Sequence, residues 1–379
     1  MANKFLLPLL ILCLLAACAA PAQTGSEPAA GTPLPTPEGF LRADRPRSFS
    51  FPADFGPHED YLTEWWYYTG NLDTEDGRHF GYELTFFRIG LQPASQNFPR
   101  SSDWASGQIY MAHFAVTDVV GQQFHAFQRF SRGAAGLAGA QGQPYQIWLE
   151  DWRAEQTGPH SFRLQASQAG VQLDLELTDV KGPVLHGMGG YSQKGPDAGN
   201  ASYYYTQPRL LSQGTIQLGE QRFEVSGLSW KDHEFSTSVL SPGQVGWDWF
   251  SIQLDNDYEL MVFELRREDG SRDPFSSGTL IHPDGSTTHL DESDFSIQVL
   301  DEWRSPHSGA TYPMGWRIQA PGLQLELELQ PFMHDQEMNM RTIYWEGAVR
   351  ISGSLASQPV HGAGYVELTG YAEAFDGDF

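Results

Sequence analysis

The stretch from Val171 to Leu177 reads VQLDLEL, in which every second residue is apolar. The same alternation recurs from Leu323 to Leu329 (LQLELEL) and from Tyr82 to Phe86 (YELTF). Because successive side chains of a β-strand point to opposite faces, this period of two predicts strands that bury one face. No apolar stripe at helical spacing extends beyond three turns. The sequence therefore predicts an all-β protein whose antiparallel sheets close into barrels or pack as sandwiches.

The composition indicates a folded, turn-rich chain. Of 379 residues, 40% are hydrophobic and only 18% are charged, and 39 Gly and 24 Pro provide for many turns. Such a chain buries a large core, so extensive disorder is excluded. Its 23 Lys and Arg stand against 47 Asp and Glu, a formal charge of −24. This surface repels phosphate backbones, and the sequence therefore predicts no nucleic-acid partner.

Three short motifs occur twice, in the same order. The pairs are Glu64–Trp66 with Asp248–Phe250, Tyr82–Leu84 with Tyr258–Leu260, and Val225–Asp232 with Val360–Glu367, the last pair sharing the pattern V-x-G-x-x-aromatic-x-acid. Their order predicts a duplicated β domain with a seam near Ser241–Gly243. We expect an N-terminal domain over residues 48–240 and a C-terminal domain over residues 241–379.

The first residues indicate export. Lys4 precedes an apolar run from Phe5 to Leu15, which is typical of a secretory signal peptide and too short for a membrane span. The sequence LAAC that ends at Cys18 matches the lipobox of bacterial lipoproteins. Residues 1–17 are therefore the predicted signal peptide, and Cys18 is the predicted lipidated first residue of the mature chain. The alternative is an ordinary signal peptide with a chance Cys.

Ala19 follows the lipobox where Asp would favour the inner membrane, so we expect a lipid anchor on the periplasmic face of the outer membrane. Residues 18–47 are rich in Ala, Pro, Gly and Thr and show no hydrophobic period. This composition predicts a flexible tether between anchor and folded body. Cys13 is removed with the signal, so the mature chain has no second thiol for a disulfide, for catalysis or for zinc.

Several catalytic and metal-binding motifs are absent from the sequence. Gly227–Lys231 (GLSWK) has Lys where a G-x-S-x-G nucleophile elbow requires its second Gly. His233 begins a sequence like a helical zinc motif, but Thr237 stands where the second His belongs. The 12 His show no ligand spacing. The sequence predicts no metal site and no cofactor.

Acidic residues embedded among aromatic residues are the main candidates for chemistry. A carboxyl group against indole rings loses water, which raises its pKa and suits it to proton donation near neutral pH. The candidate catalytic residues are Asp232, His233, Glu64 and Asp248. The candidate ligand-binding residues are Trp65, Trp66, His113, Tyr203, Tyr205, Trp247, Trp249, Tyr344 and Glu346. The alternative is that these aromatic residues are ordinary core and that the acids cap strands or pair with Arg.

Residues 181–209 form a second unusual stretch. They alternate little and are rich in Gly, yet contain a His, two Lys and four Tyr. A long irregular segment of this kind is commonly functional, and we interpret it as a loop that lines or covers a pocket. The alternative is an irregular strand that joins the two sheets.

Three of these segments carry a resemblance to a known family. They are Glu64–Tyr67 (EWWY), Lys181–Pro196 with its two Lys-Gly-Pro triplets, and Trp230–Ser236 (WKDHEFS). Across residues 48–379 the chain resembles the AttH-like lipocalin family related to carotenoid 1,2-hydratases. The resemblance implies two tandem lipocalin-like β domains side by side. It also implies water addition to an isolated double bond of a carotenoid or prenyl chain, with His233–Phe235 matching a His-x-Trp element in which Phe replaces Trp.

These observations lead to three hypotheses. In the first, a lipoprotein binds an isoprenoid, carotenoid-like or lipid ligand in an aromatic pocket, and Asp232 protonates a double bond while His233 orients it or activates water. Indole faces would stabilise the carbocation. In the second, the protein is a non-catalytic lipid carrier or an accessory lipoprotein of an ABC transporter, a partner that the family's gene neighbourhoods imply. A hydrolase is the third and weakest, because no nucleophile is evident.

Overall fold

The structure is a computed structural model that describes residues 38–96, 102, 104–238 and 240–375. The predicted signal peptide, Cys18 and the predicted tether as far as residue 37 lie outside the described residues. The residues that are described all belong to one compact unit. None of the helices in these described ranges is long and apolar enough to cross a membrane.

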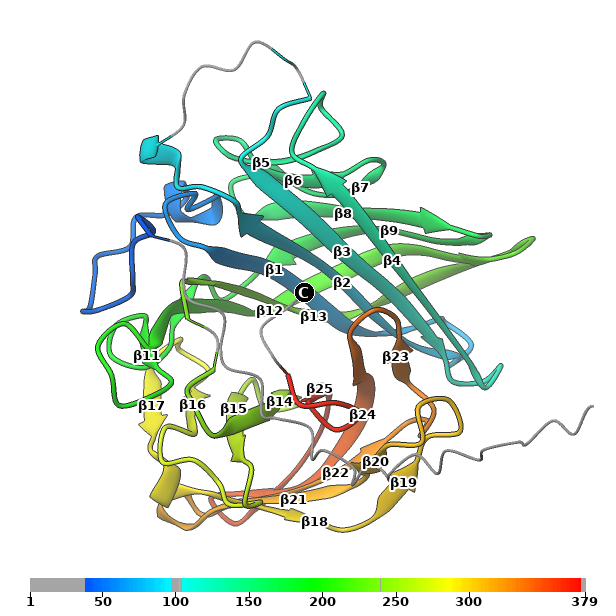
Figure 1. The fold of residues 1–379 in the computed structure, drawn as a ribbon. Coiled ribbons are helices and arrows are strands. Elements are labelled where there is room, and N and C mark those ends of the chain that lie inside the picture. Colours follow the sequence, from blue (N-terminus) through cyan, green and yellow to red (C-terminus); the bar gives the residue numbers. More distant parts are fainter. Residues whose placement is uncertain (1–37, 97–101, 103, 239, 376–379) are drawn as a thin grey trace, which may run out of the picture. The chain divides into compact units, whose positions relative to one another are not determined.

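The first large sheet is antiparallel and has 13 strands in the described part of the chain (Figure 1). The strands are β1 (Thr63–Asp73), β2 (His79–Gly90), β3 (Gln108–Asp118), β4 (Gln123–Arg132), β5 (Ala138–Gly142), β6 (Tyr145–Leu149), β7 (Trp152–Gly158), β8 (Ser161–Gln168), β9 (Val171–Asp179), β10 (Val184–Leu185), β11 (Tyr191–Gln193), β12 (Ala201–Leu218) and β13 (Gln221–Ser236). Their spatial order is β4-β3-β2-β1-β13-β12-β9-β8-β7-β6-β5, and β10 and β11 pair with β12.

The second large sheet is also antiparallel and curls below the first in Figure 1. Its strands are β14 (Gln244–Leu254), β15 (Glu259–Arg267), β16 (Ser277–Ile281), β17 (Thr287–Leu290), β18 (Ser296–Val299), β21 (Trp316–Ala320), β22 (Leu325–Pro331), β23 (Glu337–Asn339), β24 (Ile343–Leu355) and β25 (Gln358–Thr369). The spatial order is β17-β16-β15-β14-β25-β24-β22-β21-β18, with β23 paired to β24. A separate small sheet joins β19 (Glu302–Arg304) to β20 (Thr311–Pro313).

The prediction of an all-β protein is confirmed. Among the described residues the helical elements are four 3-10 turns, η1 (Ala53–Phe55), η2 (Ala94–Gln96), η3 (Glu292–Asp294) and η4 (Pro321–Leu323). The stretch VQLDLEL forms most of β9, in which the apolar residues are buried and the alternate polar residues are not. The stretch LQLELEL becomes strand only from Leu325 onward, because Pro321 starts a 3-10 turn that ends at Leu323.

The two large sheets repeat one topology. In each, the first strand (β1 or β14) is paired on one side with the second and on the other with the last, β13 or β25. Gly227 and Gly362 occupy matching places in those last strands, where an added Cβ would lie 2.1 Å from a carbonyl oxygen of the neighbouring strand. The repeated motifs thus fall on equivalent strands. The sheet changes between Ser236 and Gln244, and the predicted domain boundaries stay predictions.

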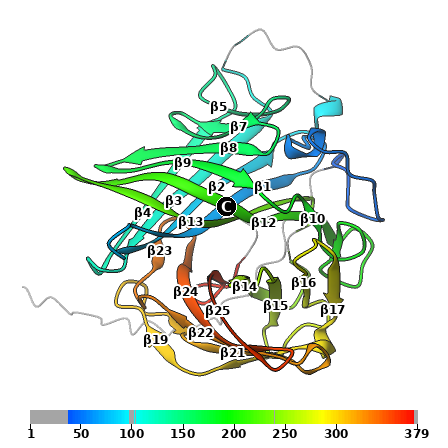
Figure 2. The same ribbon diagram turned by 180° about the vertical axis from the view of Figure 1, so that it is seen from behind.

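Strand β1 has both faces buried, because it belongs to the core of its own sheet and to the contact with the second sheet (Figure 2). Trp66 and Tyr68 point into the core of the first sheet. Tyr67 points the other way and packs in a cluster with Trp249, which comes from the second sheet. Period two therefore separates two aromatic layers along one strand. The core of the first sheet also contains Lys231, whose ammonium lies over several aromatic rings.

The end of the predicted tether is packed against the first sheet. Ala43 is fully buried, and the backbone N–H of Leu41 donates to the carbonyl of Asp60. The Tyr203 hydroxyl donates to the carbonyl oxygen of Arg45. These backbone contacts order residues 38–47, so the packed part of the chain begins before the predicted boundary at residue 48.

The stretch 181–209, expected as a loop, is partly sheet. It contains β10 and β11, and residues from Ala201 onward belong to β12. Its three consecutive tyrosines therefore lie on a strand, and their side chains alternate between two faces. The remaining irregular part reaches the second sheet, where the Lys181 ammonium donates to Glu259 at 2.6 Å.

Candidate functional site

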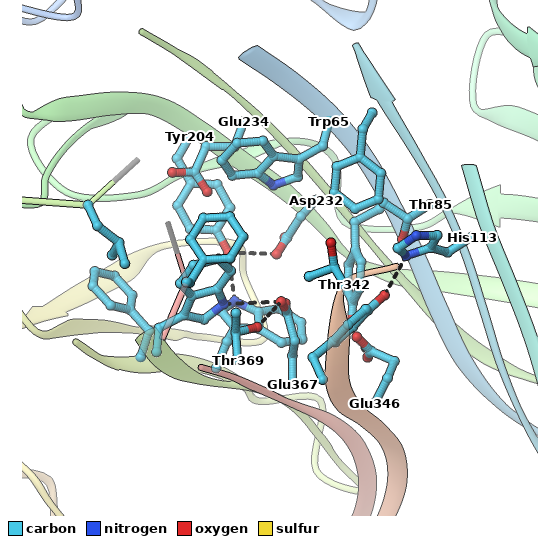
Figure 3. A pocket seen from close by; sticks show the side chains of 18 of the residues that line it. Trp65, Thr85, His113, Tyr204, Asp232, Glu234, Thr342, Glu346, Glu367 and Thr369 are labelled. Atoms are coloured by element: carbon cyan, nitrogen blue, oxygen red, sulfur yellow. Dashed lines mark hydrogen bonds between the residues drawn. The ribbon is translucent and has the colours of Figure 1, made fainter. Parts of the chain in front are cut away.

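A cavity lies where the two large sheets face one another (Figure 3). One wall comes from β1, β2, β3, β12 and β13, and the other comes from β14, β15, β24 and β25. Nine of the 20 lining residues are Phe, Trp or Tyr, so aromatic side chains are the largest group in the wall. The cavity volume is about 100 Å³. An engineered cavity of about 150 Å³ holds benzene, so this smaller cavity has room for a short stretch of hydrocarbon chain.

Seven predicted site residues line this cavity. They are Asp232, Trp65, His113, Trp247, Trp249, Tyr344 and Glu346. They come from five strands, β1, β3, β13, β14 and β24, and the packing of the two sheets brings them together. Their predicted roles in catalysis and ligand binding stay predictions.

Six predicted site residues lie outside the cavity lining: Glu64, Trp66, Tyr203, Tyr205, His233 and Asp248. Trp66 and Tyr205 belong to the core of the first sheet. Both are adjacent in sequence to a residue that lines the cavity, Trp65 and Tyr204 respectively. Neighbours along a strand point to opposite faces, so only one of each pair can reach the ligand side.

Asp248 has its own partners away from the cavity. Its Oδ1 accepts a hydrogen bond from Arg266 Nε at 2.9 Å, and its Oδ2 accepts one from the Tyr371 hydroxyl at 2.9 Å. Tyr203 packs with Ala43 and Phe235 beneath the N-terminal segment. Contacts away from the cavity therefore hold Asp248 and Tyr203, and their positions in the sequence did not reveal these contacts.

Residues that the sequence analysis did not select also line the cavity. The chief ones are Tyr67, Tyr204, Glu234, Glu367 and Lys194. Tyr204 lies between Tyr203 and Tyr205, which were predicted as ligand-binding residues. Which of these side chains faces the cavity depends on the register of the strand. Glu367 was detectable, because it occupies the position of Asp232 in the repeated motif.

Asp232 is the most strongly connected acid of the cavity. The Trp249 indole N–H donates to the Tyr204 hydroxyl at 3.0 Å, and that hydroxyl donates to Asp232 Oδ2 at 2.6 Å. The Trp230 indole N–H donates to Asp232 Oδ1 at 2.7 Å. These bonds favour the ionised form, but burial outweighs them and raises the pKa of Asp232 to about 7. A proton on Asp232 is therefore available near neutral pH.

Glu367 faces Asp232 from the second sheet. Its Oε1 accepts hydrogen bonds from the Trp247 indole N–H at 3.1 Å and from the Thr369 hydroxyl at 3.0 Å. Burial raises the pKa of Glu367 to about 7, and the negative charges of Glu234 and Asp232 add to this effect. Two carboxyl groups on opposite walls thus have pKa values in the same range.

Glu346 is fully buried and has one neutral partner. The Tyr67 hydroxyl donates to its Oε1 at 2.5 Å, while its Oε2 has no hydrogen-bond partner in the part of the chain that the structure describes. Burial and the nearby carboxyl groups of Glu367 and Glu83 raise its pKa well above the usual range. Glu83 lies behind it on β2, and burial raises the pKa of Glu83 to about 8.

His113 is a neutral imidazole at the end of the cavity where β3 lies. Burial lowers the pKa of His113 to about 3. Its Nε2 lies 2.7 Å from the Gln128 amide nitrogen, which is a donor, and its Nδ1 lies 2.8 Å from the Tyr344 hydroxyl. Nδ1 therefore carries the hydrogen and donates to Tyr344, which leaves the Tyr344 hydroxyl free to donate.

Outside the cavity, the buried acid Glu64 lies in the first sheet and contacts His58 and His233. Both imidazoles approach Glu64 Oε1 at 2.8 Å, and Arg88 Nε donates to Glu64 Oε2 at 2.9 Å. Burial alone would raise the pKa of Glu64, but Arg88 and the two His outweigh it and hold that pKa below its usual range.

These three side chains are also the group that could hold a metal ion, since their ligand atoms lie within 4.8 Å of one another. Zinc is bound by two His and one Glu in some enzymes. Here, however, the Arg88 guanidinium already compensates Glu64, and the imidazoles satisfy its other oxygen. The cluster is complete without an added cation.

The fold and the cavity define a protein of two curled antiparallel sheets with an acidic, aromatic-walled site between them. The chain belongs to the AttH-like family, whose model matches residues 42–371. The resemblance deduced from the sequence is thereby confirmed. A crystal structure of a candidate AttH protein from Nitrosomonas europaea is 32% identical, covers 88% of this chain and 100% of that chain, and has a TM-score of 0.77.

Two more distant structures share the fold. Kievitone hydratase from Nectria haematococca is 14% identical, covers 89% of this chain and 98% of its own, and has a TM-score of 0.65. CghA with Sch210972 is 12% identical, covers 84% of this chain and 90% of its own, and has a TM-score of 0.50. A search of curated proteins gives no match.

Proposed function

We propose that this protein binds a lipophilic alkene, an isoprenoid, carotenoid-like or lipid chain, and hydrates or isomerises it by acid catalysis in the cavity. The observation that carries the proposal is the pair Asp232 and Glu367. Both lie in a wall rich in aromatic residues, and both have a pKa raised to about 7. Two such groups share the protons near neutral pH, so that one serves as acid while the other serves as base.

The proposed reaction begins with proton transfer from Asp232 to one alkene carbon, which leaves a carbocation on the other. In hydration, water attacks the cation and its proton goes to the Glu367 carboxylate. In isomerisation, Glu367 instead takes a proton from the carbon next to the cation. The faces of Trp65, Trp247 and Trp249 would stabilise the positive charge. His233 lies outside the cavity and has no part in this scheme.

Two relatives support the proposal by analogy of fold. Kievitone hydratase is a hydratase by name, and CghA binds Sch210972. The AttH-like fold is therefore compatible with a hydratase and with a ligand-binding protein. The proposal for this chain rests on its own cavity and its own acids.

We also propose that Cys18 anchors the mature protein to the periplasmic face of the outer membrane. In the alternative function, the protein is a non-catalytic lipid carrier or an accessory lipoprotein of an ABC transporter. That function needs the aromatic cavity but not the raised pKa values of Asp232 and Glu367. Under it, a ligand recovered from the purified protein is chemically unchanged.

The test is deuterium incorporation. The protein is incubated in D₂O with geraniol, farnesol and squalene, and products are analysed by mass spectrometry, since protonation of an alkene carbon places deuterium on carbon in both reactions. We expect incorporation by the wild type and a loss of at least 100-fold in Asp232→Asn, because one general acid typically contributes 10²–10⁴-fold.

Asp248→Asn is the matched control, because it removes a buried carboxyl group outside the cavity. Its deuterium incorporation per folded molecule should equal that of the wild type. Circular dichroism on the same samples gives the amount of folded protein. Undiminished incorporation in Asp232→Asn would contradict the proposed mechanism. Absence of incorporation in the wild type, together with binding of the same alkenes, would favour the carrier.

A further inference from the structure

One ammonium group already lies on the wall of the cavity. Lys194 Nζ is 3.9 Å from the centroid of the Phe263 ring, 5.4 Å from that of Tyr204 and 3.5 Å from Glu234 Oε1. Its side chain is only 13% exposed. An ammonium over aromatic faces and beside a carboxylate is the arrangement by which proteins recognise organic cations. The wall therefore accommodates a largely desolvated positive charge at one end.

The rest of the wall carries acids without matching cations. Among the described residues that line the cavity, Asp232, Glu234, Glu346 and Glu367 are acidic, and Lys194 is the one Lys or Arg. Glu234 is engaged by Lys194 and by the Ser202 hydroxyl. The other three acids receive hydrogen bonds from neutral groups, namely Tyr, Trp and Thr side chains.

Glu346 has an unfilled place for a donor. Its Oε2 is buried and lacks a hydrogen-bond partner within the described ranges. A buried carboxyl oxygen without a partner costs free energy, which either protonation or a bound cation can relieve. Tyr67 and Tyr344, which line the same part of the cavity, provide aromatic faces beside it. An N–H⁺ group placed there would donate to Oε2 while its alkyl substituents contact the rings.

We propose that the cavity binds lipophilic ammonium ions, and specifically a protonated tertiary amine with an apolar chain, whose N–H donates to Glu346 and whose alkyl groups lie against the aromatic wall. This inference rests on the proposed function, because it uses the same cavity and gives its ligand the charge that the proposed carbocation carries. It does not require turnover. Because burial keeps a proton on Glu346 in the free protein, binding of the cation there releases that proton.

The test compares three soluble probes with the same decyl chain below their micelle concentrations at pH 7.5. They are N,N-dimethyldecylamine, which is protonated, its N-oxide, which has no net charge, and decyltrimethylammonium, which is charged but has no N–H. Binding to the mature protein is measured by calorimetry in two buffers that differ in ionisation enthalpy. We expect the tertiary amine to bind at least tenfold more tightly than the N-oxide, with release of protons. The trimethylammonium probe should bind with intermediate affinity.

Glu346→Gln removes the group that can become a carboxylate when the amine binds, but it keeps an oxygen that accepts from Tyr67. It should reduce the preference for the amine over the N-oxide by at least fivefold. Glu326→Gln removes an exposed carboxyl group on β22, outside the cavity, and should leave the preference intact. If Glu346→Gln fails to fold, Glu367→Gln tests the same preference.

Equal affinities for amine and N-oxide, or an unchanged preference in a folded Glu346→Gln or Glu367→Gln protein, would overturn the inference. These outcomes are separate from the test of catalysis. Deuterium incorporation that depends on Asp232 would support the proposed function even if the protein shows no preference for the amine over the N-oxide. A strong preference for the amine without deuterium incorporation would support the cation site but contradict the enzymatic function.

Discussion

Glu64 and Glu346 are both fully buried, yet their surroundings act on them in opposite directions. Glu64 is paired with Arg88 and two imidazoles, and its pKa lies below the usual range. Glu346 has the Tyr67 hydroxyl and two neighbouring acids, and its pKa lies far above that range. Burial is the same in the two places. The presence or absence of a compensating cation decides which form of the carboxyl group is stable.

The comparison separates a structural cluster from a candidate site. In the Glu64 cluster the charges and hydrogen bonds satisfy one another, and the group fastens the segment before β1 to the first sheet through His58. Between the sheets, Asp232, Glu346 and Glu367 lack such compensation and border a cavity. Acids held in that condition are characteristic of functional sites.

The largest expected effect comes from removing the cation of the compensated cluster. Arg88→Met leaves Glu64 buried without its guanidinium and should lower the free energy of unfolding by about 3–5 kcal/mol. Glu346→Gln removes the cost of keeping this acid neutral at pH 7, about 1.4 kcal/mol for each pH unit above its unfolded pKa, and should therefore raise the free energy of unfolding. Urea unfolding at pH 7 measures both. A smaller loss of unfolding free energy in Arg88→Met than in Glu346→Gln would contradict the distinction between the two clusters.

The second effect is a difference in pH dependence. Asp232 and Glu367 ionise near pH 4 when unfolded but near pH 7 when folded, so their contribution to stability is lost as pH rises from about 5 to 7. Relative to the wild type, the double variant Asp232→Asn/Glu367→Gln should therefore gain stability over that range. The gain should be up to about 1.4 kcal/mol per pH unit for each carboxyl group.

Glu64→Gln should behave in the opposite way. The folded-state pKa of Glu64 is lowered, so its contribution is present above about pH 4.5 and disappears as pH falls. The stability deficit of this variant should shrink as pH falls below about 4. Urea midpoints from pH 3.5 to 8 provide the measurement for both variants. His58 and His233 contact Glu64, so their titration changes as well in Glu64→Gln. A Glu64→Gln deficit that does not shrink below pH 4, or a double variant that gains no stability between pH 5 and 7, would refute the assignment of the two clusters.

The smallest effect distinguishes two neighbouring tyrosines. Tyr203→Phe removes one hydrogen bond, and Tyr204→Phe removes two, the one to Asp232 and the one from the Trp249 indole; stability should fall by about 1 kcal/mol for each bond lost. Tyr204→Phe also removes a donor that favours ionised Asp232, so it should raise the pKa of Asp232. The alkaline limb of deuterium incorporation should then move to higher pH in Tyr204→Phe and stay in place in Tyr203→Phe. Identical pH profiles would place Tyr204 outside the chemistry.

Much of the architecture could be predicted from local sequence. Period two at Val171–Leu177 predicted a strand with one buried face, and β9 has that pattern. The repeated motifs predicted two related sheets, and the strand orders of the two sheets match. Such patterns are readable because a strand exposes its alternation directly in the chain, whatever it packs against.

The site was predicted in part, for a physical reason. Aromatic residues next to acids marked the right segments, but in Trp65-Trp66 and in Tyr203–Tyr205 the sequence did not state which face of the strand meets the second sheet. Both faces of these strands are buried, so hydrophobicity could not distinguish them. The 3-10 turn before β22, which makes the strand begin at Leu325, was not evident from the alternation either. The packing of residues 38–47 likewise depends on contacts beyond the local pattern.

By itself the sequence determined an all-β chain, a repeated strand order and family membership, because these follow from alternation and from motifs that are local. Tertiary structure decided which acids are compensated. Glu64 and Glu346 look alike in sequence, each adjacent to a tryptophan. Only the pairing of β1 with β2 brings Arg88 to Glu64, and only the packing of the two sheets places Glu346 beside other acids, because charge compensation is a property of neighbours in space.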